Sequence, residues 1–183
     1  MKKHSLQEKF LIYKVRQHKD ADAYGKLYDY YVDRIFRFVF FKVGSQEEAE
    51  DLTSESFLKT WEYINKTNKK IDNFNALIYR VARNVVIDSY RTRRNDVPAT
   101  DEEQMLRIQD QRDIEKEVNI EFEIKSVEKH LAQLKETYRE VIILRYIEEF
   151  SITEISEITG KNKANVRVLL HRGLTALKEI AKK

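Results

Sequence analysis

The scarcity of chain-breaking residues most strongly constrains how this sequence can fold. The 183 residues include one proline and four glycines, whereas turn-rich β folds need such residues at many positions. Leucine, lysine, glutamate and arginine recur throughout, and apolar side chains stand three or four positions apart, which is typical of amphipathic helices. The sequence therefore predicts an all-α protein.

Composition and charge restrict the class of protein further. The chain has no cysteine, which excludes disulfides and thiolate metal sites. Its first fifteen residues lack the apolar core of a signal peptide, and its longest uncharged apolar runs, 38–41 and 141–144, fall far short of the roughly 20 residues that span a bilayer. The net charge is only +3, so a surface that binds a polyanion requires basic residues segregated along the chain. We expect a cytoplasmic protein without metal ions or cofactors.

Three helices are predicted in the first half of the chain. The first places five side chains on one face: Leu27, Tyr31, Ile35, Phe38 and Lys42. The second begins at a capping box of Ser45 and Glu48 and continues to about residue 64. The third begins near Asn75 and carries arginines along one side and at its end. The polar segment 65–74 connects the second helix to the third.

An acidic segment separates this half from the next. Residues 95–123 contain ten acidic and three basic side chains, with the only proline, Pro98, near the start. This composition favours a linker, and it predicts a domain over 1–95, a linker over 96–121 and a second domain over 122–183. The alternative is a solvated helix inside one continuous domain.

The second domain is predicted to contain four helices. Ile120, Ile124, Val127, Leu131 and Leu134 form a helical seam. A second helix is expected over 137–150, a third after the capping box of Ser151 and Glu154, and a fourth after Asn162. Gly160 separates the last two.

Two short helices joined by a glycine-containing turn are typical of a helix-turn-helix, whose second helix reads the major groove of DNA. The spacing of five apolar residues would pack the pair together: Ile155, Ile158, Val166, Leu170 and Leu174. Basic and amide side chains then remain on the exposed side of the second helix, and arginine and asparagine pair with guanine and adenine edges. A plain helical hairpin with surface charges is the alternative interpretation.

Three blocks of this sequence resemble the extracytoplasmic-function (ECF) group of the bacterial sigma-70 family. Residues 28–64, which include AEDLTSESFLKTW, are similar to regions 2.1 and 2.2. Residues 74–94, which include LIYRVARN, are similar to regions 2.3 and 2.4, and residues 131–178 are similar to region 4. The order of the blocks and the acidic linker between them agree with this resemblance. It implies two small helical domains, a region 2 bundle and a region 4 helix-turn-helix, and a subunit that directs core RNA polymerase to promoters.

The resemblance implies that the second predicted helix binds the clamp coiled coil of the polymerase β′ subunit, and that region 4 meets the β flap. Acidic side chains beside apolar ones fit a basic coiled coil through charge complementarity. The candidate polymerase-binding residues are Asp51, Glu55, Phe57, Leu58 and Trp61. Phe57 and Trp61 are also expected in the hydrophobic core.

The resemblance further implies that the second block binds the minus-10 element as single-stranded DNA. This needs cations for the backbone, flat groups for stacking and a pocket for an extruded base. The candidates are Asn68, Asn73, Phe74, Arg80, Arg83, Asn84, Tyr90, Arg91 and Arg94.

Region 4 would read the minus-35 element from the last predicted helix. The candidates are Lys163, Asn165, Arg167, Val168, His171 and Arg172. Val168 and Leu169 stand where a serine–arginine pair is common in the family, and Gly173 replaces a usual alanine. A glycine there either permits a close backbone approach or is simply tolerated.

Two other functions remain open. A stand-alone helix-turn-helix regulator would bind duplex DNA without polymerase, but it would leave the first two blocks without a role. An enzyme would have to use the carboxylates of residues 47–55, which no metal-ligand, P-loop or nucleophile–base motif accompanies. The family resemblance also implies an anti-sigma factor as a partner, often membrane-bound.

Overall fold

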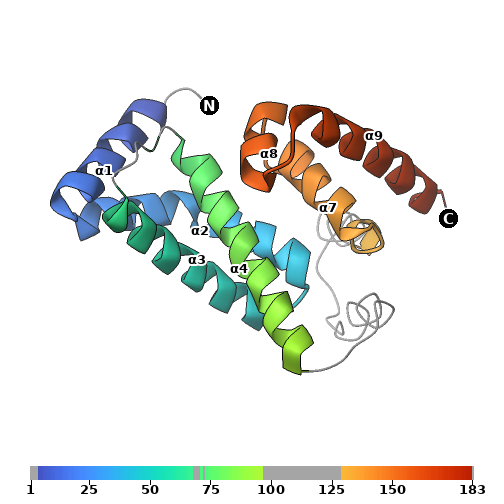
Figure 1. The fold of residues 1–183 in the computed structure, drawn as a ribbon, viewed down its shortest axis with the longest axis horizontal. Coiled ribbons are helices and arrows are strands. Elements are labelled where there is room, and N and C mark those ends of the chain that lie inside the picture. Colours follow the sequence, from blue (N-terminus) through green and yellow to red (C-terminus); the bar gives the residue numbers. More distant parts are fainter. Residues whose placement is uncertain (1–3, 68–70, 72, 97–128, 183) are drawn as a thin grey trace, which may run out of the picture. The chain divides into compact units, whose positions relative to one another are not determined.

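The computed structural model describes residues 4–67, 71, 73–96 and 129–182, and only the backbone at 4, 5 and 93–96 (Figure 1). Every regular element within these ranges is a helix, which confirms the predicted fold class. Contacts divide the chain into two compact units. Unit 1 comprises Met1–Phe40 and Ser45–Asp88, and unit 2 comprises Phe41–Gly44 and Ser89–Lys183. Among the described helices, none combines the length and apolar character that crossing a bilayer needs.

The first part of the chain contains four helices: α1 (His4–His18), α2 (Ala21–Val43), α3 (Gln46–Lys66) and α4 (Phe74–Asp96). The last three are the helices that the sequence predicts, and α1 is an addition. Ser45 caps α3 as expected, because its side chain accepts a hydrogen bond from the Glu48 amide at 3.4 Å. The predicted inner face of α2 is buried throughout, including the side chain of Lys42.

Aromatic rings join the helices of unit 1. Tyr31 of α2 lies against Phe74 of α4, with ring centroids 5.2 Å apart, and Phe38 meets Tyr79 at the same distance. The guanidinium of Arg34 lies over both tyrosine rings, 5.9 and 5.7 Å from their centroids. Ring packing of this kind contributes beyond the apolar area that it buries.

Unit 2 ends in a compact set of short helices: α7 (Glu136–Ile142), the π-helical turn η2 (Ile143–Ile147), α8 (Ile152–Thr159) and α9 (Lys163–Ile180). The prediction of one α-helix over 137–150 is wrong in its second half. The Glu148 amide bonds to the Ile143 carbonyl at 3.0 Å, five residues back. Ile143, Leu144 and Phe150 are all buried, so the segment contributes its apolar side chains to the core although its hydrogen bonds depart from the α-helical pattern.

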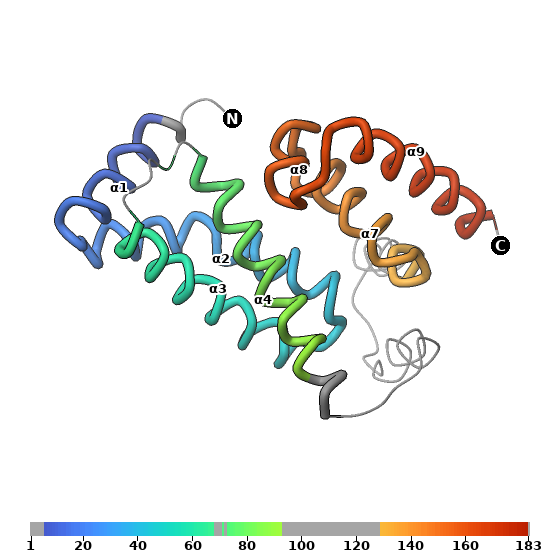
Figure 2. The backbone as a smooth tube through the Cα atoms, in the orientation of Figure 1, coloured from blue at the N-terminus to red at the C-terminus, as the bar shows by residue number. Residues whose placement is uncertain are grey.

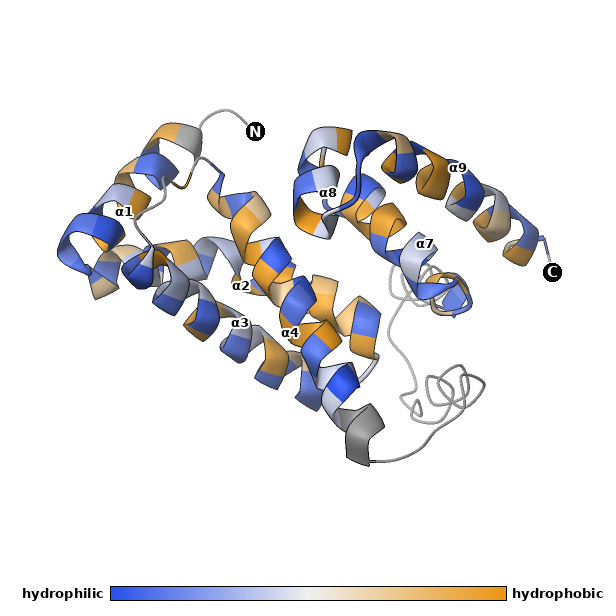
Figure 3. Ribbon diagram, in the orientation of Figure 1, coloured by the Kyte–Doolittle hydropathy of each residue, from blue (hydrophilic) through white to orange (hydrophobic). Residues whose placement is uncertain are grey.

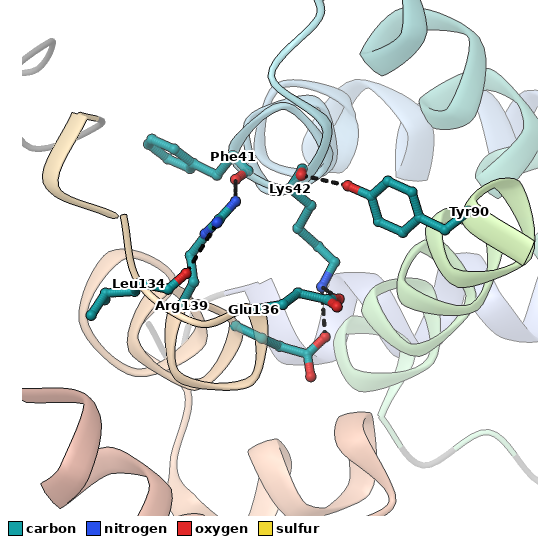
Figure 4. Close-up of polar contacts among 7 residues, drawn as sticks. Phe41, Lys42, Tyr90, Leu134, Glu136 and Arg139 are labelled. Atoms are coloured by element: carbon teal, nitrogen blue, oxygen red, sulfur yellow. Dashed lines mark hydrogen bonds and ion pairs between the residues drawn. The ribbon is translucent and has the colours of Figure 1, made fainter. Parts of the chain in front are cut away.

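Unit 2 also contains an ion pair away from solvent (Figure 4). Lys42 Nζ lies 2.8 Å from Glu140 Oε1 and 3.2 Å from Glu136 Oε1. The side chains of Lys42 and Glu140 are 1% and 4% exposed, so each charge has exchanged its hydration for this pairing. The Tyr90 hydroxyl donates to the Lys42 carbonyl at 2.7 Å.

A buried arginine stands beside this pair. Arg139 donates to the carbonyls of Leu134 at 3.1 Å and Phe41 at 3.5 Å (Figure 4). It also donates to the Ala132 carbonyl at 2.8 Å. Burial lowers the pKa of its guanidinium, and the three carbonyls offset part of the desolvation. Unit 2 thus encloses charges that hydrophobic periodicity alone does not predict.

The acidic linker predicted over 96–121 falls outside the described residues apart from the backbone of its first residue, as do Ile120, Ile124 and Val127 of the predicted seam. The last two seam residues, Leu131 and Leu134, are described, and both are 2% exposed.

Candidate functional site

An acidic stripe runs along the exposed side of α3. Asp51, Glu55 and Leu58 follow each other at helical spacing, and Glu62 continues the line. All four are exposed, with Leu58 at 59%. Glu55 pairs with Lys59 at 2.7 Å, and both side chains remain nearly half exposed, so this pair restrains the carboxylate only weakly. An apolar residue among carboxylates is the surface that a basic, amphipathic helix would cover.

The two aromatic candidates on α3 face inward. Phe57 is 3% exposed and packs on Tyr28, with ring centroids 4.6 Å apart. Trp61 is half-buried against Tyr24, 4.9 Å between centroids, and the Tyr24 hydroxyl donates to the Phe57 carbonyl. Phe57 has almost no surface for a partner, so its role is to hold α3 in place.

A polar stripe runs along α4. Arg80, Asn84 and Arg91 are exposed, and Arg83 is half-buried next to them. Their spacing puts them on one side, opposite the buried Ile78, Val85 and Val86. Figure 3 shows hydrophilic and hydrophobic bands alternating along this helix. Arginines in a row with an amide between them suit the backbone and bases of a single strand.

The five other minus-10 candidates do not belong to this stripe. Asn73 caps α4, because its Oδ1 accepts from the Ala76 amide at 3.0 Å. Phe74 is fully buried, so its ring packs the core and cannot stack on a base without a conformational change. Tyr90 is half-buried, and its hydroxyl is bonded to the Lys42 carbonyl. Asn68, like the side chain of Arg94, lies outside the described residues.

The backbone turns from α8 into α9 (Figure 2), and local hydrogen bonds build the two ends of this turn. Ser151 and Glu154 form the predicted capping box at the start of α8, with each side chain bonded to the other residue's amide. Gly160 ends α8 in a left-handed conformation, φ 69°, which glycine adopts without a steric penalty. Asn162 begins α9 by accepting from the Asn165 amide at 2.8 Å.

The turn leaves one side of α9 free. Ile155, Ile158, Val166 and Leu170 are buried, as predicted, and Leu174 is half-buried. The predicted DNA-reading residues are all exposed: Lys163, Asn165, Arg167, Val168, His171 and Arg172. This arrangement presents two arginines, an asparagine and a lysine from one short helix, as a major-groove reader requires.

The sequence assigned no role to α1, which exposes a hydrophobic stripe. Leu11, Ile12 and Val15 are buried, whereas Leu6, Phe10 and Tyr13 on the other side are 80%, 57% and 56% exposed. In the sequence, these two sets of apolar residues each recur at helical spacing on a different side, and this pattern could have predicted both the helix and its exposed apolar side.

Within the described ranges, no group of three or more histidine, cysteine, aspartate or glutamate side chains could hold a metal ion. The carboxylates of residues 47–55 lie along a helix surface as solvated charges and form no such cluster.

Comparison with protein families finds two matching segments. Residues 27–95 match Sigma-70 region 2, and residues 124–177 match Sigma-70, region 4. The chain is 30% identical over 169 residues to ECF RNA polymerase sigma factor SigW of Bacillus subtilis (strain 168), covering 87% of this chain and 89% of that one. The chain belongs to the ECF group of the sigma-70 family. It is also 30% identical over 158 residues to ECF RNA polymerase sigma factor BldN of Streptomyces coelicolor, and there it spans 60% of the relative's length.

Solved structures share the fold of this ECF sigma factor. CnrH in complex with the cytosolic domain of CnrY matches with a TM-score of 0.72 at 19% identity, over 96% of this chain and 97% of that one. The sigma factor RpoE in complex with the anti-sigma factor NepR from Bartonella quintana matches with a TM-score of 0.70 at 19% identity, over 86% and 96% of the two chains.

Proposed function

We propose that this ECF sigma factor binds core RNA polymerase and brings it to promoters with two recognition elements. The observation that carries the proposal is the separation of chemistry between helices. Carboxylates around Leu58 line α3, whereas arginines and amides line α4 and α9. A protein that must hold another protein and DNA at the same time needs such separate surfaces.

In this proposal, α3 binds the clamp of the polymerase β′ subunit through Asp51, Glu55 and Leu58. The residues of α4 bind the opened minus-10 strand, and residues 65–74 accept an extruded base. The exposed side of α9 reads the minus-35 element, and the β flap holds region 4. Residues 96–121 act as the tether, which raises the effective concentration of the second site once the first is bound.

The chain itself would carry out no chemistry, because bond formation belongs to the polymerase, and it would act in the cytoplasm. Its fold is shared with sigma factors solved in complex with CnrY and NepR. We therefore infer that an anti-sigma factor, soluble or membrane-bound, covers the polymerase-binding surfaces when transcription is not required.

The decisive experiment is transcription from fragmented genomic DNA by bacterial core polymerase that lacks sigma, with and without this protein. New RNA start sites that share two upstream elements at a fixed spacing are expected. The same tubes report whether the protein binds core polymerase. No new starts and no binding would overturn the proposal, and tight footprints by the isolated protein would favour a stand-alone regulator.

Single substitutions then test the division between helices. Each of Arg167→Ala and Arg172→Ala should lower initiation that depends on the upstream element by about tenfold, since one good base contact contributes about 1–3 kcal/mol. Lys178→Ala, an exposed cation near the end of α9, is the matched control and should change little. Affinity for core polymerase, measured by fluorescence anisotropy, should stay constant in all three variants. Loss of that affinity would contradict the assignment of α9 to DNA.

A further inference from the structure

Gly173 lies inside α9 at a point where a side chain would be crowded by α7. It is buried, and a Cβ atom added there would lie 3.0 Å from Ile142 Cδ1 and 3.2 Å from Tyr138 Cβ, both on α7. The Cβ of Tyr138 is fixed to the backbone of α7 and cannot retreat unless the helix moves. The Ile142 methyl is the end of a flexible chain and can move more easily.

The second helical glycine, Gly25 in α2, lacks this constraint. A Cβ at Gly25 meets nothing within 4 Å, and the residue is exposed. Glycine within a helix is less favourable than alanine, and Gly173 has no left-handed backbone angle that would require it. The close approach of α7 is therefore the physical reason for glycine at 173. Because the residue faces α7, it does not serve an approach to DNA.

The position of Gly173 gives it influence over the exposed side of α9. It follows directly after Arg172, and the residues from 163 to 172 lie within about 15 Å of it along the helix axis. Val166 and Leu170 are buried on the same side of α9 as Gly173, so the packed side of the helix continues from Gly173 toward the exposed row. A displacement of a few tenths of an ångström at Gly173 would tilt α9 about this contact, so the shift grows with distance along the helix toward Lys163. Binding sites need their groups placed to within about 0.5 Å.

We propose that Gly173 is a positioning residue: the missing side chain sets the distance between α7 and α9, and this distance determines which bases Arg167, Arg172 and their neighbours reach. The inference rests on the proposed function of α9 as the reader of the upstream element. It adds a specificity-determining role for a residue that touches no DNA.

The test uses the complete chain with core polymerase and a promoter mapped in the transcription experiment, next to a copy whose upstream element is scrambled. The readout is the ratio of initiation from the intact and scrambled templates. Gly173→Ala should lower this ratio by about tenfold, equivalent to the loss of one base contact, while transcription from the scrambled template stays unchanged. Gly25→Ala makes the same chemical change in open space and should leave the ratio at the wild-type value.

The double variant Gly173→Ala/Ile142→Val removes the methyl at 3.0 Å and should recover part of the ratio. It also serves as the second test if Gly173→Ala alone does not fold, which its thermal transition would reveal. Because the contact with Tyr138 Cβ at 3.2 Å remains, the folded double variant should keep a ratio below the wild-type value, and a wild-type ratio would overturn the proposal. An unchanged ratio in a folded Gly173→Ala variant would overturn it, as would an equal loss on both templates. If the wild-type protein initiates equally well on the intact and scrambled templates, the proposed function of α9 itself is overturned.

Discussion

The two units are stabilised by different chemistry. In unit 1, aromatic rings join α2 to α3 and α4, and the buried polar side chains described are the hydroxyls of Thr53, Ser56 and Thr60. In unit 2, aliphatic residues surround buried charges, including Lys42, Glu140 and Arg139. The difference teaches that two all-helical units of one chain can have cores that respond differently to substitution. Removing one ring contact lowers the free energy of unfolding by a small amount, whereas removing one partner of a buried ion pair lowers it strongly.

The largest effect should come from separating the buried ion pair of unit 2. Lys42→Met leaves the Glu140 carboxylate, 4% exposed, without the cation at 2.8 Å, and we expect a loss of about 3–5 kcal/mol in the free energy of unfolding. Urea unfolding followed by circular dichroism measures it. Replacing both charges, in Lys42→Met/Glu140→Leu, should restore most of the loss. If the single variant is as stable as the double variant, an unpaired buried charge is not costly in unit 2, and the two cores do not differ in this respect.

Alkaline pH should destabilise unit 1. Burial raises the pKa of both the Tyr24 and Tyr31 hydroxyls above 10, so the folded state keeps protons that the unfolded state releases. Stability from these groups is complete below pH 10 and falls above it, by about 1.4 kcal/mol per pH unit for each tyrosine. Hydrogen exchange resolved by peptide should show protection in α2 and α3 falling first between pH 9.5 and about 11.

The matched variants Tyr24→Phe and Tyr31→Phe cannot ionise and should each make this decline shallower. If they follow the wild-type profile, the alkaline loss has another origin, such as the lysines.

The smallest expected effect is the loss of stability on removing a helix cap, and it should differ between Ser151 and Ser45. The box at Ser151 has two reciprocal bonds, at 3.2 and 2.9 Å, and begins a helix of eight residues. Ser45 makes one bond at 3.4 Å before a helix of 21 residues. Ser151→Ala should therefore cost about 1 kcal/mol, and Ser45→Ala about half of that. Calorimetric midpoints of the two variants make the comparison, and equal shifts would indicate that cap geometry does not matter here.

Local signals explain what the sequence could predict. Ser151 and Asn162 begin α8 and α9 through bonds to residues three positions along the chain, and Gly160 ends α8 with a left-handed backbone angle, so the helix-turn-helix is predictable without tertiary structure. The faces of α3 and α9 follow from helical spacing for the same reason.

Tertiary contacts explain what the sequence could not predict. A π-helical turn at 143–147 takes the place of the second half of a predicted α-helix, and the Tyr90 hydroxyl donates to a carbonyl 48 residues away. Phe74 fitted the chemistry of base stacking, yet packing against Tyr31 gives it a place in the core. The choice between a tolerated and a required glycine at 173 needed the position of α7.

The placement of Trp61 has a practical consequence. It is the only tryptophan in the chain, it lies in unit 1 against Tyr24, and it follows Leu58 by three positions on α3. Intrinsic fluorescence excited at the red edge of absorption therefore arises from unit 1 alone, without any label. The same indole, half-buried at the edge of the acidic stripe, should change its emission when a partner covers α3, while events on α9 leave the spectrum unchanged.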